Sequence, residues 1–156
     1  MMATYEIVSR DLAAQITAVV RGEMPVAELG DWLANTYRAV QEHLKRIGMN
    51  PVGPPFARFT FLGDVVAVEA GFPVAGEIAG NGNVEPSILP CGLAALTTHV
   101  GRYEGLSAAF DAVHDWLNTH GYMTAGPHWE VYYDDPNAEP DPSRWRTDVV
   151  VPYSVR

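Results

Sequence analysis

The sequence predicts an α+β fold built from two strand-helix-strand-strand units. Together they should form a mostly antiparallel sheet with two long helices on one face and a central cleft. Three observations support this: one motif occurs twice, 73 residues apart; each copy has an apolar stripe at helical spacing followed by strand-like segments; and only the turn at residues 81–83 separates the copies. We therefore expect a single domain over residues 1–156, with halves of about 1–80 and 83–156.

The repeated motif is an apolar helix face followed by glycines and a proline. Its first copy consists of Leu33, Tyr37, Val40, Leu44, Gly48, Gly53 and Pro54, and its second copy of Leu106, Phe110, Val113, Leu117, Gly121, Gly126 and Pro127. A duplication of this kind predicts a groove between the halves, and such grooves commonly bind ligands. Function is expected where the copies differ, and the sharpest difference is Glu130, which stands where the first copy has Ala57.

The first half is predicted to contain one helix. Pro25 fits its first turn, and the helix should end near Ile47, because Gly48 follows two basic residues. Alternating or clustered β-branched residues predict strands at residues 5–9, 16–20, 56–62 and 65–72.

The second half repeats the order, with a helix at residues 106–119 and strands at residues 93–100, 129–133 and 146–151. Pro152 is expected to end the last strand, because proline has no N–H for the sheet. Residues 134–143 are acidic and rich in proline, so we expect an exposed loop there.

Composition excludes several classes of function. A net charge of −9 and a pI near 4.8 argue against nucleic-acid binding, whereas an acidic field favours cationic small molecules or serves solubility alone. Cys91, the single cysteine, is interpreted as a small buried residue, and the histidines show no metal-ligand spacing, so no metal or cofactor is predicted. No segment resembles a signal peptide or a membrane span, which predicts a cytoplasmic protein without a membrane partner.

Glu130 is the residue with the clearest chemistry. In a strand it shares a face with Tyr132, and a carboxylate among aromatic neighbours is costly unless a cation or a hydrogen-bond donor pairs with it. One hypothesis makes Glu130 the anchor for a cationic aromatic ligand. The walls would then be Tyr37, Phe59, Tyr103, Phe110 and Tyr132. In the alternative, Arg58 or a tyrosine hydroxyl satisfies Glu130 inside the protein, and the helix aromatics belong to the core.

Two further segments carry a family resemblance. The run from Thr98 through His99, Gly101, Tyr103 and Gly105 to Leu106, followed by Trp129-Glu130-Val131-Tyr132 and Asp135-Pro136, resembles the GyrI-like small-molecule-binding family. This family is also called the bacterial transcription activator effector-binding domain and is related to the SOUL haem-binding proteins. The resemblance covers nearly the whole chain. It implies a cleft that, in multidrug-responsive regulators, holds cationic aromatic compounds against a glutamate at the position of Glu130.

The resemblance leaves several functions open. The chain enters its first strand almost at once, so we expect a stand-alone form without a DNA-binding domain, active in drug sensing or sequestration. Some stand-alone relatives are hydrolases that open cyclopropane-bearing natural products; there Glu130 would be the general base, and Tyr103 or Tyr132 would orient the electrophile. Others are gyrase inhibitors, which implies a protein partner for the acidic loop 134–141. Haem binding is not expected, because no histidine is singled out by its position.

Overall fold

The computed structural model describes residues 4–155 and divides the chain into two compact units. Ala13–Cys91 form what we call the contiguous unit. The residues up to Leu12, together with those from Gly92 onward, form the split unit. Within the described residues, no helix is both long and apolar enough to cross a membrane.

The contiguous unit contains four antiparallel strands in the order β5-β2-β4-β3 and one long helix. The strands are β2 (Gln15–Pro25), β3 (Phe56–Leu62), β4 (Val65–Pro73) and β5 (Glu85–Leu89). Helix α1 (Leu29–Arg46) follows the 3-10 turn Val26–Glu28 and packs on β2 and β4. Its apolar stripe, which includes Val40 and Leu44, joins Ala18 and Phe72 in the core of this unit.

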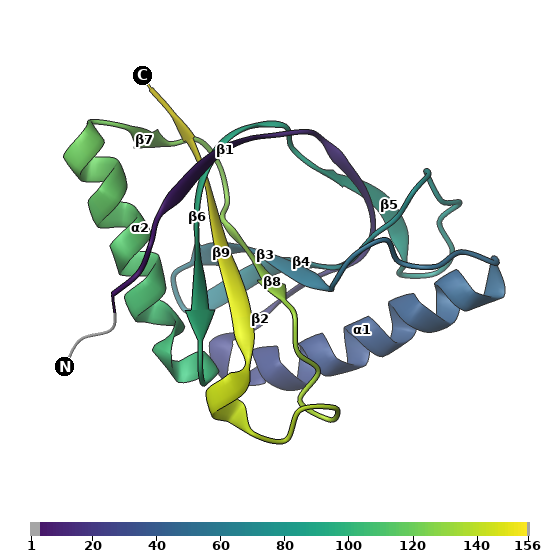
Figure 1. Cartoon of the computed structure of the whole chain (residues 1–156). Helices are drawn as coiled ribbons and strands as arrows, with labels where there is room; N and C mark the ends of the chain where they lie inside the picture. The colour runs from purple at the N-terminus through teal and green to yellow at the C-terminus, as the bar shows by residue number, and fades with distance from the viewer. Residues whose placement is uncertain (1–3, 156) are drawn as a thin grey trace. The chain divides into compact units, whose positions relative to one another are not determined.

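The split unit repeats the pattern, with four strands in the order β1-β6-β9-β8. They are β1 (Val8–Leu12), β6 (Gly92–Val100), β8 (Trp129–Tyr132) and β9 (Arg146–Ser154), and the short β7 (Met123–Thr124) pairs with the end of β9. Helix α2 (Leu106–His120) follows the 3-10 turn Tyr103–Gly105 and lies alongside β6 and β9 (Figure 1). A third 3-10 turn, Pro142–Arg144, precedes β9.

The α+β fold class is confirmed, and the repeat is visible at the helix ends. Gly48 and Gly121, 73 residues apart, have positive φ angles of 75° and 72°. The amide after each glycine donates to a carbonyl five residues earlier: Met49 N to Leu44 O and Tyr122 N to Leu117 O, both at 2.9 Å. Both helices therefore end in the same left-handed glycine cap.

The unit limits differ from the predicted halves because the edge strands are exchanged. β1 directly precedes β2 in the chain but pairs with β6, whereas β5 directly precedes β6 but pairs with β2. β1, from the first half of the sequence, thus completes the sheet of the split unit, and β5, from the second half, completes the sheet of the contiguous unit.

Several predicted elements need correction. The first strand spans Val8–Leu12 rather than residues 5–9, and β5 and β7 were not predicted. Pro152 does not end the last strand but lies inside β9, opposite Ala94. On the other side of β9, residues 147–150 pair with β8 and residues 153–154 pair with β7. Pro152 falls between these two stretches, where the missing N–H is tolerated. Cys91 is exposed rather than buried, because it lies in the short connection between β5 and β6.

Candidate functional site

The predicted pair on β8 lies as the strand alternation requires. Trp129 is buried in the split unit, whereas Glu130 and Tyr132 share the other face of the strand. The Tyr132 hydroxyl donates a hydrogen bond of 2.7 Å to the Oε1 atom of Glu130. Of the two internal partners considered from the sequence, the tyrosine hydroxyl is therefore present.

Tyr103 joins this pair through its ring. It lies on the 3-10 turn before α2, and its ring meets that of Tyr132 edge-on, with centroids 5.8 Å apart. On its other side it stacks on Trp145, at a centroid distance of 4.8 Å and an interplanar angle of 30°. Trp145 is held in turn by a hydrogen bond from its indole nitrogen to the Glu139 carbonyl, 2.8 Å away. We call Tyr132, Tyr103 and Trp145 the aromatic wall.

Burial dominates the electrostatics of this cluster. Burial raises the pKa of Glu130, and this effect outweighs the opposing influence of the Tyr132 hydrogen bond and of the nearby His99. The pKa of Tyr103 is also raised, first by burial and then by the negative charges of Asp134, Asp135 and Glu130. The Tyr103 hydroxyl, which is protonated at neutral pH even at its ordinary pKa of 10.0, can therefore donate a hydrogen bond.

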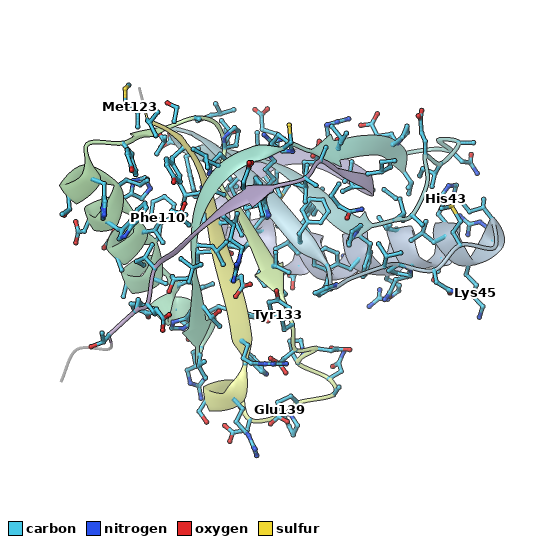
Figure 2. All side chains as sticks on the ribbon, turned by 45° about the horizontal axis from the view of Figure 1, so that its top comes forward. His43, Lys45, Phe110, Met123, Tyr133 and Glu139 are labelled. Carbon is cyan, nitrogen blue, oxygen red and sulfur yellow. The ribbon has the colours of Figure 1, made fainter. Side chains whose placement is uncertain are left out.

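Phe110 lies on α2 of the same unit, where Figure 2 labels it. Its ring contacts those of His114 and His128, at centroid distances of 4.3 and 4.6 Å. Burial and the neighbouring His114 lower the pKa of His128 to about 4, so His128 is neutral at physiological pH. Phe110 therefore lies between two imidazole rings, of which that of His128 is neutral at physiological pH.

Tyr37 and Phe59 belong to the contiguous unit. Tyr37 donates its hydroxyl to the Phe56 carbonyl at 2.9 Å and packs edge-on against Phe72, at the rim of the unit's core. Phe59 is buried on β3, and its ring stacks on that of Phe61 with centroids 6.4 Å apart. Their role as ligand walls stays a prediction.

Two residues of the site were not singled out from the sequence. Trp145 carried no signal beyond its aromatic character, because its contact with Tyr103 spans 42 positions of the chain. His99 lies in the family motif, yet its bonds to Tyr5 and Arg102 appear only in the folded unit.

The contiguous unit contains a hollow of about 460 Å³ at the junction of β2 and α1. The indole of Trp32 covers Gly22 there, so closely that a Cβ at Gly22 would lie 2.6 Å from the ring. The lining also includes Met24, Ala27 and the acidic residues Glu23, Glu28 and Asp31, and it contains none of the predicted site residues.

The acidic loop after β8 is largely bonded to itself. Asp134 accepts hydrogen bonds from the backbone and the side chain of Arg146, and Asp135 and Asp141 accept from backbone amides two residues further on. Figure 2 shows Glu139 in this loop and Tyr133 at its start. Within residues 4–155, no three histidine, cysteine or acidic side chains gather closely enough to hold a metal ion.

The family assignment follows from a direct match. Residues 5–154 match the model of the GyrI-like small molecule binding domain. The chain belongs to this family. No curated protein sequence matches this GyrI-like domain, so the remaining comparisons are with solved structures.

Three solved structures illustrate the shared fold. The EcmrR C-terminal domain has a TM-score of 0.85 at 18% identity, over 97% of this chain and 99% of that one. A hydrolase from Listeria innocua has a TM-score of 0.66 at 12% identity, over 96% and 92% of the two chains. SAV2435 bound to tetraphenylphosphonium has a TM-score of 0.65 at 11% identity, over 97% and 94%.

Proposed function

We propose that this GyrI-like domain binds hydrophobic, cationic aromatic small molecules, with Glu130 as the anionic anchor, and that it serves in drug sensing or sequestration. The observation that supports this most directly is a partly buried carboxylate beside an aromatic wall. Burial disfavours the charged form of Glu130, and a bound organic cation would compensate for that cost. Aromatic faces also attract cations, so wall and anchor favour the same ligand.

The structural neighbour SAV2435 was solved with tetraphenylphosphonium, a cation of this class, which makes that compound a suitable probe. A role of Tyr37, Phe59 and Phe110 as further apolar walls stays a prediction from the sequence. A cytoplasmic location and a protein partner for residues 134–141 stay predictions from the sequence.

Calorimetric titration of tetraphenylphosphonium tests the proposal, with triphenylphosphine oxide as a neutral analogue. We expect the protein to bind the cation and not the oxide. Glu130→Gln preserves the shape and the acceptor for Tyr132 but removes the charge, so it should weaken binding by about 1–3 kcal/mol. Glu42→Gln, which makes the same charge change at an exposed position on α1, is the matched control and should leave the affinity unchanged.

An affinity that Glu130→Gln does not change would refute the anchor. Trp32→Ala distinguishes a second location, because Trp32 lines the hollow of the contiguous unit. Binding that is lost in Trp32→Ala and retained in Glu130→Gln would assign the cation to that hollow instead.

Hydrolysis of a strained electrophile is the second candidate, and the raised pKa of Glu130 favours it. A carboxylate of raised pKa is a stronger general base, and it would take a proton from the attacking water. The C–O bond would form as a ring C–C bond of the cyclopropane breaks, and the electron pair of the broken bond would pass to a conjugated carbonyl oxygen of the substrate. Tyr103, whose hydroxyl is protonated at neutral pH, would donate a hydrogen bond to that carbonyl oxygen, on which the negative charge develops. Mass spectrometry of cyclopropane-bearing electrophiles at high enzyme concentration separates the candidates. A hydrolase forms the water adduct and loses this activity, but not binding, in Glu130→Gln.

A further inference from the structure

His99 lies near the end of β6, is only 7% exposed, and has a partner for each ring nitrogen. Its Nε2 atom is 2.8 Å from the Arg102 carbonyl oxygen, and its Nδ1 atom is 2.8 Å from the Tyr5 hydroxyl. Because a carbonyl only accepts, Nε2 carries the proton and donates to Arg102. In the neutral ring Nδ1 is then the acceptor, and the Tyr5 hydroxyl donates to it.

The Arg102 carbonyl is the first acceptor of the turn that carries Tyr103. The Gly105 amide donates to the same oxygen at 3.1 Å and closes the 3-10 turn. A carbonyl oxygen has two lone pairs, so the bond from His99 fills the second acceptor position. The imidazole thereby holds the turn from the side of β6.

Gly105 shows how closely the turn lies on the ring. A Cβ at this position would be 2.7 Å from Cε1 and 3.0 Å from Nε2 of His99. The Gly105 backbone is in the ordinary helical region, with φ −84° and ψ −5°, so a side chain here is excluded by space and not by conformation.

We infer that His99 is a positioning residue of the cation site. Its Nε2–H fixes the turn on which Tyr103 meets Trp145 and Tyr132, and the Tyr5 hydroxyl, by donating to Nδ1, stabilises the tautomer that makes this bond. The inference rests on the proposed binding of cations at Glu130, and it assigns His99 no contact with the ligand.

Two conservative substitutions separate the two nitrogen positions. His99→Gln extends far enough to place an amide N–H near the position of Nε2, whereas His99→Asn reaches only as far as Nδ1. We expect His99→Asn to bind tetraphenylphosphonium about tenfold more weakly than the wild type, the loss of roughly one hydrogen bond. His99→Gln should restore the affinity to within about threefold of the wild type.

Val113→Ala controls for a general loss of stability. Val113 is fully buried on α2 in the core of the same unit, so its truncation should lower the melting temperature at least as much as His99→Asn. We expect its affinity for the cation to be unchanged. Equal weakening by Val113→Ala, or a His99→Gln variant that binds as weakly as His99→Asn, would overturn the inference.

A measurement without ligand distinguishes this inference from the proposed function. The indole N–H signal of Trp145 in a ¹⁵N NMR spectrum reports on the ring that stacks on Tyr103. It should shift in His99→Asn and return in His99→Gln, whether or not any cation binds; an unshifted signal in His99→Asn overturns the inference. A protein that shows this pattern but binds no cation refutes only the proposed function.

Gly105→Ala is the second variant should His99→Asn fail to fold. Its Cβ would push the turn away from the imidazole while His99 itself is retained. We expect the same shift of the Trp145 signal and a similar loss of affinity, and wild-type behaviour in both measurements would overturn the inference.

Discussion

The carboxylate of Glu130 lies in partly buried surroundings, where its ionised form is disfavoured. The Tyr132 hydrogen bond and the nearby His99 offset part of this cost, but the pKa remains above its ordinary value. A protein selected for stability alone would have no reason to keep such a group. The presence of Glu130 at a position where the first copy of the repeat has alanine fits the proposed role of this residue as a ligand anchor.

The raised pKa has a consequence for stability that can be measured. A carboxyl whose pKa is higher in the folded than in the unfolded state binds more protons when the protein is folded. Its contribution to the free energy of unfolding is therefore fully present below the unfolded-state pKa, near 4.5, and is lost as the pH rises through the folded-state pKa. Glu130→Gln should therefore raise the melting temperature at pH 7, and the gain should shrink as the pH falls through the folded-state pKa towards 4.5 and be absent below that pH.

Differential scanning fluorimetry of the wild type and Glu130→Gln between pH 4 and pH 8 checks this expectation. The difference between the two proteins is the quantity of interest, because other carboxylates titrate equally in both. A variant that is less stable than the wild type at pH 7 would contradict the expected burial cost.

At the scale of elements, the two helix ends are the clearest product of the repeat. Gly48 and Gly121 hold positive φ angles that an alanine adopts only with strain. Gly48→Ala and Gly121→Ala should each lower the free energy of unfolding by about 1 kcal/mol. Chemical denaturation measures this directly.

Gly30→Ala is the matched control for the two caps. Gly30 lies exposed within α1, and a Cβ there would meet nothing within 4 Å. Alanine is the better helix former, so this change should raise stability by up to about 1 kcal/mol. Cap variants that behave like Gly30→Ala would show that the left-handed caps do not need glycine.

The helices and hairpin strands were predictable because their signals are local. Apolar spacing placed α1 and α2 to within a few residues, and the Gly63-Asp64 turn fixed the β3-β4 pair. β5 was missed because Pro86 interrupts its pattern, and it is a strand only through its pairing with β2.

The site was likewise predictable where its signals are local and not where they depend on contacts between distant residues. Strand alternation put Glu130 beside Tyr132, whereas the stacking of Trp145 on Tyr103 and the bonds of His99 depend on tertiary packing.

At the scale of the whole molecule, the exchange of β1 and β5 links the two halves of the sequence, because each of these strands pairs with a strand from the other half. The exposed turn Asn81-Gly82-Asn83 lies where the halves were predicted to divide, within the contiguous unit. A chain cut at Gly82 leaves β1 and β2 on one fragment and β5 and β6 on the other, and both pairs of partners cross the cut. We expect the fragments to elute together in gel filtration.

A protease site inserted at Gly82 makes this test possible, since Asn81 and Asn83 are exposed as well. The cleaved protein should separate into two fragments only in denaturant. Fragments that separate in native buffer would contradict the exchanged strands.

The exchange of β1 and β5 also determines the order in which the strands of each unit can pair during translation. Residues 13–91 are continuous, so the contiguous unit has its strands and its helix as soon as β5 has emerged. β1 is synthesised before all of these elements, yet its hydrogen-bonding partner β6 begins 80 residues after Leu12, at Gly92. During translation, β1 therefore has an unpaired edge for longer than any other strand of the sheet that contains Glu130, and the synthesis of that sheet ends only with β9.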